Sequence, residues 1–463
     1  MPNVEEIWTL VDSKREAFFE LSDRVWETPE LNYQEVLSSE AHLEMLRAQG
    51  FRVTQHVADL PTALMGEAGE DGPVIAILGE FDALPGLSQA AGIAAAQPLT
   101  EGGHGHGCGH NLLGAGALMA ATAVKDYLDK HKLKGRVRYY GCPAEEGGSA
   151  KGFMVRAGVF DDVDIAISWH PACFPAVNNP VSLACNELNF HFTGRSSHAA
   201  ATPHLGRSAL DAVELMNVGV NYMREHMPST ARVHYALIDA GGPAPNVVQA
   251  KATVRYLVRG RDLPELQALV ARVKKIAEGA ALMTETQVRS EVVSGDANLV
   301  GNGTLEALMH KHLLHLGPPH FDARDKAFAE KIQATLSADD VVAAFRRGGV
   351  PLRKGLPLAD AIVPLGAGDT SLVGSTDVGT VSWVVPTVQM RGATWTIGTP
   401  GHSWQVVAQG KSALAHKGME HCAKVMAATA LDLIRKPDLI AEAKADLQDR
   451  SLARPSSIRS RTM

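Results

Sequence analysis

A glycine-rich segment between residues 104 and 111 concentrates side chains that can bind metal ions. It reads His-Gly-His-Gly-Cys-Gly-His-Asn, and an apolar, helix-like run follows from Leu112. Thiolate and imidazole groups are ligands for zinc and manganese-class ions. Glycines allow a turn tight enough for Cys108 and His110 to face one ion. The segment therefore predicts a metal site.

Three later segments supply more ligand types after apolar runs. Glu145 and Glu146 follow a strand-like run and precede two glycines, so adjacent side chains can point in different directions. One carboxylate can then hold a metal while the other takes a proton from the attacking water. His170 ends a further apolar run, and His402 lies in the segment Gly-Thr-Pro-Gly-His-Ser. These residues are the candidate partners of the glycine-rich segment.

Other interpretations of these residues stay open. The glycines could cradle a phosphate at a helix N-terminus, but no register supplies the third glycine of G-x-G-x-x-G. Cys108 could act as a nucleophile beside His110, which would leave the acidic pair without a role. The acidic pair could be solvated, and the two later histidines could be ordinary polar residues. We interpret His104 and His106 as polar loop groups rather than ligands.

Composition limits the classes of function. With 463 residues and 45% hydrophobic content, the chain can bury a large core and form two domains. A net charge of -7 argues against nucleic-acid binding. We expect no secretory signal, because the acidic N-terminal region lacks a basic start followed by an apolar run, and no membrane span, because no apolar run is long enough to cross a bilayer. Five scattered cysteines favour free thiols in a reducing cytoplasm, so we expect a cytoplasmic protein.

The pattern of apolar runs predicts the elements that must position these groups. Two helices are expected between residues 7 and 50, strands over 74–78, 137–140 and 164–168, and a helix over 112–131. This alternation predicts an α/β fold with a mostly parallel, doubly wound sheet, in which chemistry lies beyond the carboxyl ends of the strands. Asp82, the acidic pair and His170 fall at such ends.

The pattern changes at residue 187. Alternating, strand-like segments and two amphipathic helices, over 208–226 and 263–282, predict a compact α+β insert. Strands of the first domain are expected to resume near Thr380 to Val385. We therefore expect a catalytic domain formed by residues 1–186 and 298–463 and a smaller inserted domain formed by 187–297.

Five motifs together carry a resemblance to a known family. They are Gly-His-Gly-Cys-Gly-His ending at His110, Pro-Ala-Glu-Glu-Gly-Gly from Pro143, Trp-His-Pro from Trp169, Ser-His-Ala-Ala from Ser197 and Gly-His-Ser from Gly401. This set resembles the aminoacylase/carboxypeptidase metallopeptidase family, in its amidohydrolase branch that includes auxin-conjugate hydrolases. The resemblance extends from the N-terminal helices to about residue 428.

The resemblance implies a site with two divalent metal ions, Mn²⁺ or Zn²⁺, and Glu145 as the general base. The implied ligands are Cys108, His110, Glu146, His170 and His402. The wider family has a His-x-Asp motif, whereas this chain has Gly-Glu-Phe-Asp over residues 79–82. A ligand role for Asp82 is therefore in doubt, although it could still orient a ligand.

The resemblance also implies that the insert is a lid and dimerisation domain. His198 would then reach the site of the neighbouring subunit in a homodimer, and Asn246 and Arg259 would contact a small-molecule substrate. The expected reaction is hydrolysis of the amide bond of an N-acyl or N-aroyl amino acid. Alternatives are an indole-acetyl-amino-acid hydrolase, a hydrolase of other N-acyl amino acids or dipeptides, and a non-catalytic metal-binding subunit of a larger complex. A homologous second subunit is a further candidate partner.

Overall fold

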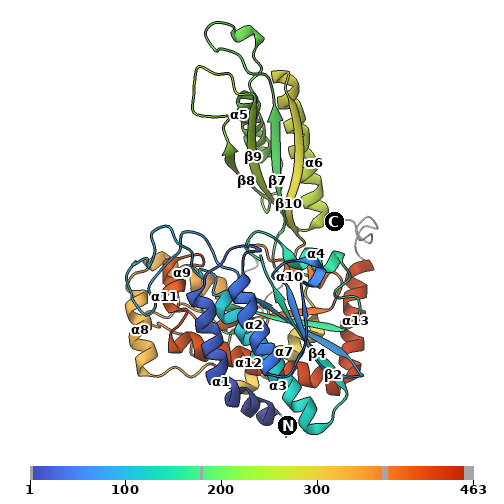
Figure 1. Cartoon of the computed structure of the whole chain (residues 1–463). Helices are drawn as coiled ribbons and strands as arrows, with labels where there is room; N and C mark the ends of the chain where they lie inside the picture. Colours follow the sequence, from blue (N-terminus) through green and yellow to red (C-terminus); the bar gives the residue numbers. More distant parts are fainter. Residues whose placement is uncertain (1–3, 178–180, 368–373, 453–463) are drawn as a thin grey trace.

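The chain forms two units, each built around its own β-sheet. The computed structural model describes residues 4–177, 181–367 and 374–452. The larger unit contains a seven-stranded sheet, and the smaller unit, with a four-stranded sheet, stands on top of it (Figure 1).

The large sheet has parallel strands at its centre and antiparallel strands at its edges. Its order is β1-β2-β4-β3-β5-β11-β6, and the neighbours among β4, β3, β5 and β11 are parallel. The strands are β1 (Arg52–Gln55), β2 (Leu64–Glu70), β3 (Val74–Glu80), β4 (Gly135–Cys142), β5 (Ile165–Ala172), β6 (Ala176–Val177) and β11 (Thr387–Ala393). The expected α/β fold is confirmed, and each antiparallel pair of this sheet includes β1, β2 or β6.

Helices cover both faces of this sheet, which explains the continuous apolar run of β3. Ile75 and Ile77 pack into the core formed with α1 (Val4–Glu27), α3 (His110–His131) and α12 (Ala413–Arg435). Ala76 and Leu78 point to the other face, towards α4 (Ala150–Arg156) and α10 (Val378–Ser382). A strand buried on both faces needs no polar alternation. The larger unit also contains α2 (Val36–Ala48), α7 (Gly303–Leu316), α8 (Ala323–Gln333), α9 (Ala338–Gly348), α11 (Trp404–Gln409) and α13 (Pro437–Leu452).

The prediction of a strand at residues 380–385 is wrong. This segment contains most of helix α10, and the strand that returns to the sheet is β11, which begins at Thr387. Val378, Val381 and Val385 are all buried in one core, at the three- and four-residue spacing of a helix. A short valine-rich run fits either a strand or a buried helix, so its periodicity did not decide between them.

The smaller unit is an antiparallel sheet with two helices on one face. Its order is β10-β7-β9-β8, and α5 and α6 pack against the sheet. Its elements are β7 (Ala184–Thr193), α5 (Ala209–Met223), β8 (Arg232–Asp239), β9 (Lys251–Gly260), α6 (Leu263–Thr284) and β10 (Gln287–Asp296). Phe190, Val213 and Tyr256 belong to a hydrophobic core of its own. Among the helices of the described residues, none combines the length and hydropathy needed to cross a membrane.

Candidate metal centre

The carboxyl ends of the parallel strands bring the candidate groups to one edge of the large sheet. Glu80 ends β3, Glu145 and Glu146 lie on the turn after β4, and His170 lies on β5. His110 begins α3, which packs on the same strands. This is the edge at which ligands bind in open α/β sheets.

Glycine is required in the turn that carries Cys108 and His110. Gly109 has a φ of 80°, and a Cβ atom there would lie 3.0 Å from the Cγ of Pro171. A larger residue would therefore be strained and would press on β5. The opposite loop is tied to this turn, because the His402 amide donates to the carbonyl oxygen of Gly107 at 2.9 Å.

Five candidate ligands form two groups that share one thiol. Cys108, His110 and His170 form the first group, and Cys108, Glu146 and His402 form the second. The Cys108 Sγ and His170 Nε2 are 3.3 Å apart, and the Glu146 Oε2 and His402 Nε2 are 3.4 Å apart. Bonds of 2.0–2.3 Å to one ion would separate two adjacent ligand atoms by about 2.9–3.6 Å. Both distances fit ligands that share an ion.

Asp82 orients this cluster. Its Oδ1 lies 2.7 Å from the His110 Nδ1, and its Oδ2 accepts a hydrogen bond from the Glu146 amide at 2.8 Å. The buried Nε2 of His110 has no hydrogen-bond partner among the described residues. A histidine whose Nδ1 is held by a carboxylate presents Nε2 to a metal. The structure therefore supports an orienting role for Asp82.

Burial shifts the pKa values of most groups in the cluster towards their neutral forms. Desolvation and neighbouring carboxylates raise the pKa of Glu145 well above its usual value, and burial raises the pKa of Glu146 to about 7. Burial also raises the pKa of the Cys108 thiol and lowers the pKa of His170. Burial opposes the charged form of His110, but Asp82 and Cys108 raise its pKa above the usual range. Divalent cations would lower the raised pKa values of the carboxyl and thiol groups and hold these groups ionised.

The donor set fits the metals expected from the sequence. Thiolate and imidazole suit zinc, and imidazole with carboxylate suits manganese-class ions. In the described part of the chain, five buried or nearly buried carboxyl groups lie at this site together with one buried ammonium group. They are Glu80, Asp82, Glu145, Glu146 and Asp377, with Lys151 as the ammonium. If all were ionised, two divalent ions would neutralise the surplus negative charge.

Two of the expected substrate-contacting residues lie away from this cluster within one chain. His198 and Asn246 are exposed and lie beside each other in the smaller unit, where the Ala199 amide donates to the Asn246 carbonyl oxygen at 2.9 Å. The His198 Nδ1 accepts from the amides of Ala200 and Ala201 at 3.2 and 3.1 Å. Neither residue lines the cavity at the metal cluster.

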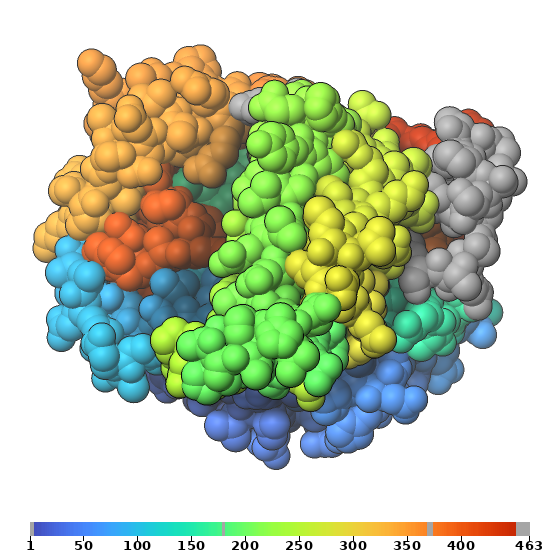
Figure 2. All heavy atoms as spheres, turned by 90° about the horizontal axis from the view of Figure 1, so that it is seen from above, coloured from blue at the N-terminus to red at the C-terminus, as the bar shows by residue number. Residues whose placement is uncertain are grey.

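Arg259 does reach this cavity. It lies on β9 at the base of the smaller unit, and its Nη1 is 3.4 Å from the Ser375 Oγ. The cavity has a volume of about 560 Å³ and also exposes Cys108, Glu145 and the other candidate ligands except His110. Seen from above, the smaller unit (green and yellow) lies across the larger one, beside the orange segment that includes α8 and α9 (Figure 2).

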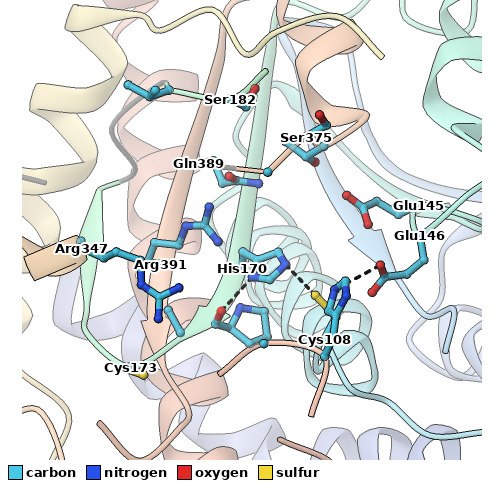
Figure 3. Close-up of a pocket in the computed structure, with 18 of the residues that line it drawn as sticks. Cys108, Glu145, Glu146, His170, Cys173, Ser182, Arg347, Ser375, Gln389 and Arg391 are labelled. Atoms are coloured by element: carbon cyan, nitrogen blue, oxygen red, sulfur yellow. Dashed lines mark hydrogen bonds and ion pairs between the residues drawn. The ribbon is translucent and has the colours of Figure 1, made fainter. Parts of the chain in front are cut away.

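Sequence reasoning missed two arginines of the cavity wall. Arg391 on β11 is the register partner of His170 on β5, and Arg347 lies in the last turn of α9. Figure 3 shows them on one side of His170, with Glu145 and Glu146 on the other. Arg391 would have been detectable if the strand had been placed at Thr387. Arg347 had no signal, because it occurs in a charged segment that resembles surface helix.

Comparisons with known proteins agree with this geometry. Residues 76–345 match the model of peptidase family M20/M25/M40. One subunit of the p-aminobenzoyl-glutamate hydrolase of Escherichia coli (strain K12) is 45% identical over 459 residues, which cover 96% of this chain and 95% of that protein. The Xaa-Arg dipeptidase of Mus musculus is 30% identical and covers 96% of this chain and 92% of its own length.

A solved structure shares the fold. The dinuclear metal-binding peptidase of the M20 family from Bacillus subtilis is 19% identical, with a TM-score of 0.53 over 91% of this chain and 99% of that one. The family model covers more than half of the chain, and a relative with 45% identity spans nearly all of it. The chain therefore belongs to peptidase family M20/M25/M40, and it is a metal-dependent hydrolase of amide bonds.

Proposed function

We propose that this enzyme hydrolyses the amide bond of an N-aroyl or N-acyl amino acid of the p-aminobenzoyl-glutamate type and releases the free amino acid. The observation that carries the proposal is the composition of one cavity. It joins the candidate metal ligands to three arginines, Arg259, Arg347 and Arg391. A substrate with an amide bond beside one or more carboxylates matches this combination.

The residues divide into metal ligands and a proton carrier. Cys108, His110, Glu146, His170 and His402 would hold two divalent ions, Mn²⁺ or Zn²⁺. When bound, such ions polarise the amide carbonyl and favour deprotonation of water. Glu145 lies beside the ligands, lines the same cavity and accepts the proton of the attacking water as general base. It then delivers that proton to the leaving amine.

The arginines recognise the acidic end of the substrate. Arg259 approaches from the smaller unit, and its planar guanidinium suits bidentate binding of a carboxylate. Arg391 and Arg347 line the wall nearest His170. A glutamate product carries two carboxylates, so more than one cation in the pocket supports an acidic amino acid rather than a neutral one.

The smaller unit would act as a lid and dimerisation domain with boundaries at residues 187 and 297. In a homodimer, His198 and Asn246 of one chain would complete the site of the other. The five cysteines are unpaired, which supports a reducing compartment such as the cytoplasm.

A second, homologous subunit is a further possible partner. The 45% identical relative is itself one subunit of a hydrolase, and the other named subunit of that Escherichia coli enzyme is 28% identical to this chain over 283 residues. Two related chains in one enzyme support a pairing of the same kind here.

An assay of the purified chain tests the reaction. The apoenzyme, prepared with a chelator, is reloaded with Mn²⁺ or Zn²⁺ and given p-aminobenzoyl-glutamate, indole-acetyl-aspartate, N-acetyl-alanine and an Xaa-Arg dipeptide. We expect turnover only with metal, and the highest kcat/KM for the first substrate. Full activity in the metal-free chain, or no hydrolysis of any acidic conjugate, would contradict the proposal.

A dipeptidase is the second candidate, because the mouse relative is named for Xaa-Arg substrates. Asp296 also lines the cavity and would favour a basic side chain. The three arginines oppose this alternative by like-charge repulsion. Higher kcat/KM for the Xaa-Arg dipeptide would favour the dipeptidase, and metal binding without any turnover would favour a non-catalytic subunit.

A further inference from the structure

Lys151 is fully buried next to the metal cluster, and no step of the proposed reaction uses it. Its Nζ lies 2.7 Å from the Glu80 Oε1 and 2.6 Å from the Asp377 Oδ1. Its amide also donates to the Asp377 Oδ2 at 3.1 Å. A buried ammonium group is costly unless it is paired, and one carboxylate is enough to balance its charge. Asp377 can fill that role with both of its oxygens.

The second carboxylate, Glu80, therefore brings a surplus negative charge into a buried place. Its side chain is 2% exposed, and its Oε2 has no hydrogen-bond partner among the described residues. It lies 3.3 Å from the Nε2 of His110, within ion-pair distance if that histidine is protonated. This Nε2 is also buried and without a hydrogen-bond partner in the same part of the chain. Two unsatisfied buried atoms that face each other call for a shared third group.

A cation satisfies both atoms. The 3.3 Å between the Glu80 Oε2 and the His110 Nε2 falls within the separation of about 2.9–3.6 Å expected for two ligands of one ion. The distances between Cys108 and His170 and between Glu146 and His402 fall in the same range. The His110 Nε2 and the Glu145 Oε2 are farther apart, at 4.0 Å. Glu80 thus has the closer spacing to His110 of the two carboxylates that form a group of possible ligands with it.

The backbone fixes Glu80 in this position. Glu80 ends β3, and α3 approaches it closely at Gly114, where a Cβ atom would lie 2.6 Å from the Glu80 carbonyl oxygen. Any larger residue at position 114 would push the helix, and His110 with it, away from the strand. Lys151 then holds one oxygen of Glu80 and leaves the other directed at His110.

We infer that Glu80 is a sixth metal ligand, on the ion that His110 holds, and that Lys151, neutralised by Asp377, is the residue that positions it. This inference rests on the metal centre of the proposed function. In that arrangement Lys151 neither contacts substrate nor carries a proton. It fixes the orientation of a ligand through an ion pair that is closed to solvent.

Glu80→Gln tests the inference with little risk to the fold. The amide keeps the size of the side chain and an oxygen that can accept from Lys151, while Asp377 still balances the ammonium. We expect the apoenzyme to bind one of its two ions at least about tenfold more weakly in calorimetric titration with Zn²⁺. X-ray absorption of the zinc-loaded variant should show fewer oxygen and nitrogen neighbours per ion at about 2.0–2.2 Å.

A matched control and a second variant keep the result interpretable. Asp432→Asn removes another partly buried carboxylate that pairs with a histidine, His312, at 3.2 Å and does not line the cavity. It should leave both zinc affinities unchanged. Glu80→Asp keeps the charge but shortens the reach to the ion, and it should weaken the same binding step. Thermal unfolding midpoints check that each variant is folded.

The outcomes separate this inference from the proposed function. If the wild-type chain binds two ions and both Glu80 variants keep their affinities and neighbour numbers, Glu80 only neutralises Lys151 and the inference is overturned. The proposed function would stand in that case. If the wild-type chain binds no divalent ion, the proposed function fails first.

Discussion

Asp82 and Glu146 are joined by a hydrogen bond from the Glu146 amide to the Asp82 Oδ2 at 2.8 Å, while the other oxygen of Asp82 holds His110 at 2.7 Å. One fully buried carboxylate thus ties the turn after β4 to the first residue of α3. This hydrogen bond orients the peptide group between Glu145 and Glu146, so the two adjacent side chains leave one fixed turn. Both side chains line the cavity, but the Glu146 Oε2 lies 3.4 Å from the His402 Nε2, whereas the Glu145 Oε2 lies 4.0 Å from the His110 Nε2.

This difference predicts opposite phenotypes for the two glutamates. Glu145→Gln should keep both metal ions and lose on the order of a hundredfold or more in kcat, because a general base is removed. Glu146→Gln should lose metal as well as rate. Elemental analysis of each purified variant, together with kcat at saturating metal, distinguishes the two roles. A metal-depleted Glu145 variant beside a metal-replete Glu146 variant would mean that the two roles are reversed.

The sequence predicts those parts of the site that local chemistry encodes. Cys108 and His110 are two residues apart on a glycine-rich turn, and His170 ends an apolar run. Both the ligand type and its place in the fold can therefore be predicted from the sequence. The central strands are predictable for a similar reason, because a run such as 74–78 is apolar without alternation. The roles of His198, Asn246 and Arg259 came from the family resemblance alone.

The remaining parts depend on contacts between distant segments. Lys151 meets Glu80 and Asp377, which are 71 and 226 residues away in sequence. The sequence does not distinguish a buried lysine from a surface lysine, and only the folded structure shows which groups surround it. The prediction of a strand at 380–385 was wrong for another reason, because a short valine-rich run fits both the strand and the helix periodicity.

The exposed position of His198 predicts a site shared between subunits. In one chain it lies outside the cavity, so it can act only if a second chain presents it. There it would donate to the oxyanion that forms when the amide carbonyl is attacked, a contribution of about 10²–10³ in rate. Mixing His198→Ala with Glu145→Gln should restore activity, because each mixed dimer has one site with both residues intact. Mass spectrometry must first demonstrate the mixed dimers, and their inactivity would exclude the shared site.

Acid sensitivity should include a contribution from His421, a buried histidine of α12. Burial lowers its pKa to about 4, while its Nε2 lies 2.7 Å from the Gly317 carbonyl oxygen. Because its pKa is lower in the folded state than in the unfolded state, its contribution to stability is complete above pH 6.5 and is lost as the pH falls towards 4. Between pH 7 and 5 this loss is about 2 kcal/mol.

His421→Gln can still donate to Gly317 but does not titrate. Its free energy of unfolding should therefore fall less than that of the wild-type chain between pH 7 and 5. Urea unfolding of both proteins in chelator measures this difference without the pH dependence of metal binding. Equal losses in the two proteins would show that His421 is not held neutral by burial.

Carboxylate recognition by Arg259 is the last prediction, and the charges at the metal centre give its reason. The five carboxylates at the metal centre, offset by Lys151, roughly cancel the charge of two divalent ions, so the metal cluster itself attracts an anionic substrate only weakly. A separate cation must bind the carboxylate, and Arg259 lies on the wall of the same cavity, 3.4 Å from Ser375.

Lysine cannot reproduce bidentate pairing, so Arg259→Lys should raise KM steeply, with both metal ions retained and kcat less affected. Amidation of the α-carboxylate of the substrate should raise KM for the wild-type enzyme to a similar extent and should have little further effect on the variant, since both changes remove one interaction. If the blocked substrate is hydrolysed with unchanged kcat and KM, the enzyme is a general amidase and does not require an amino-acid carboxylate.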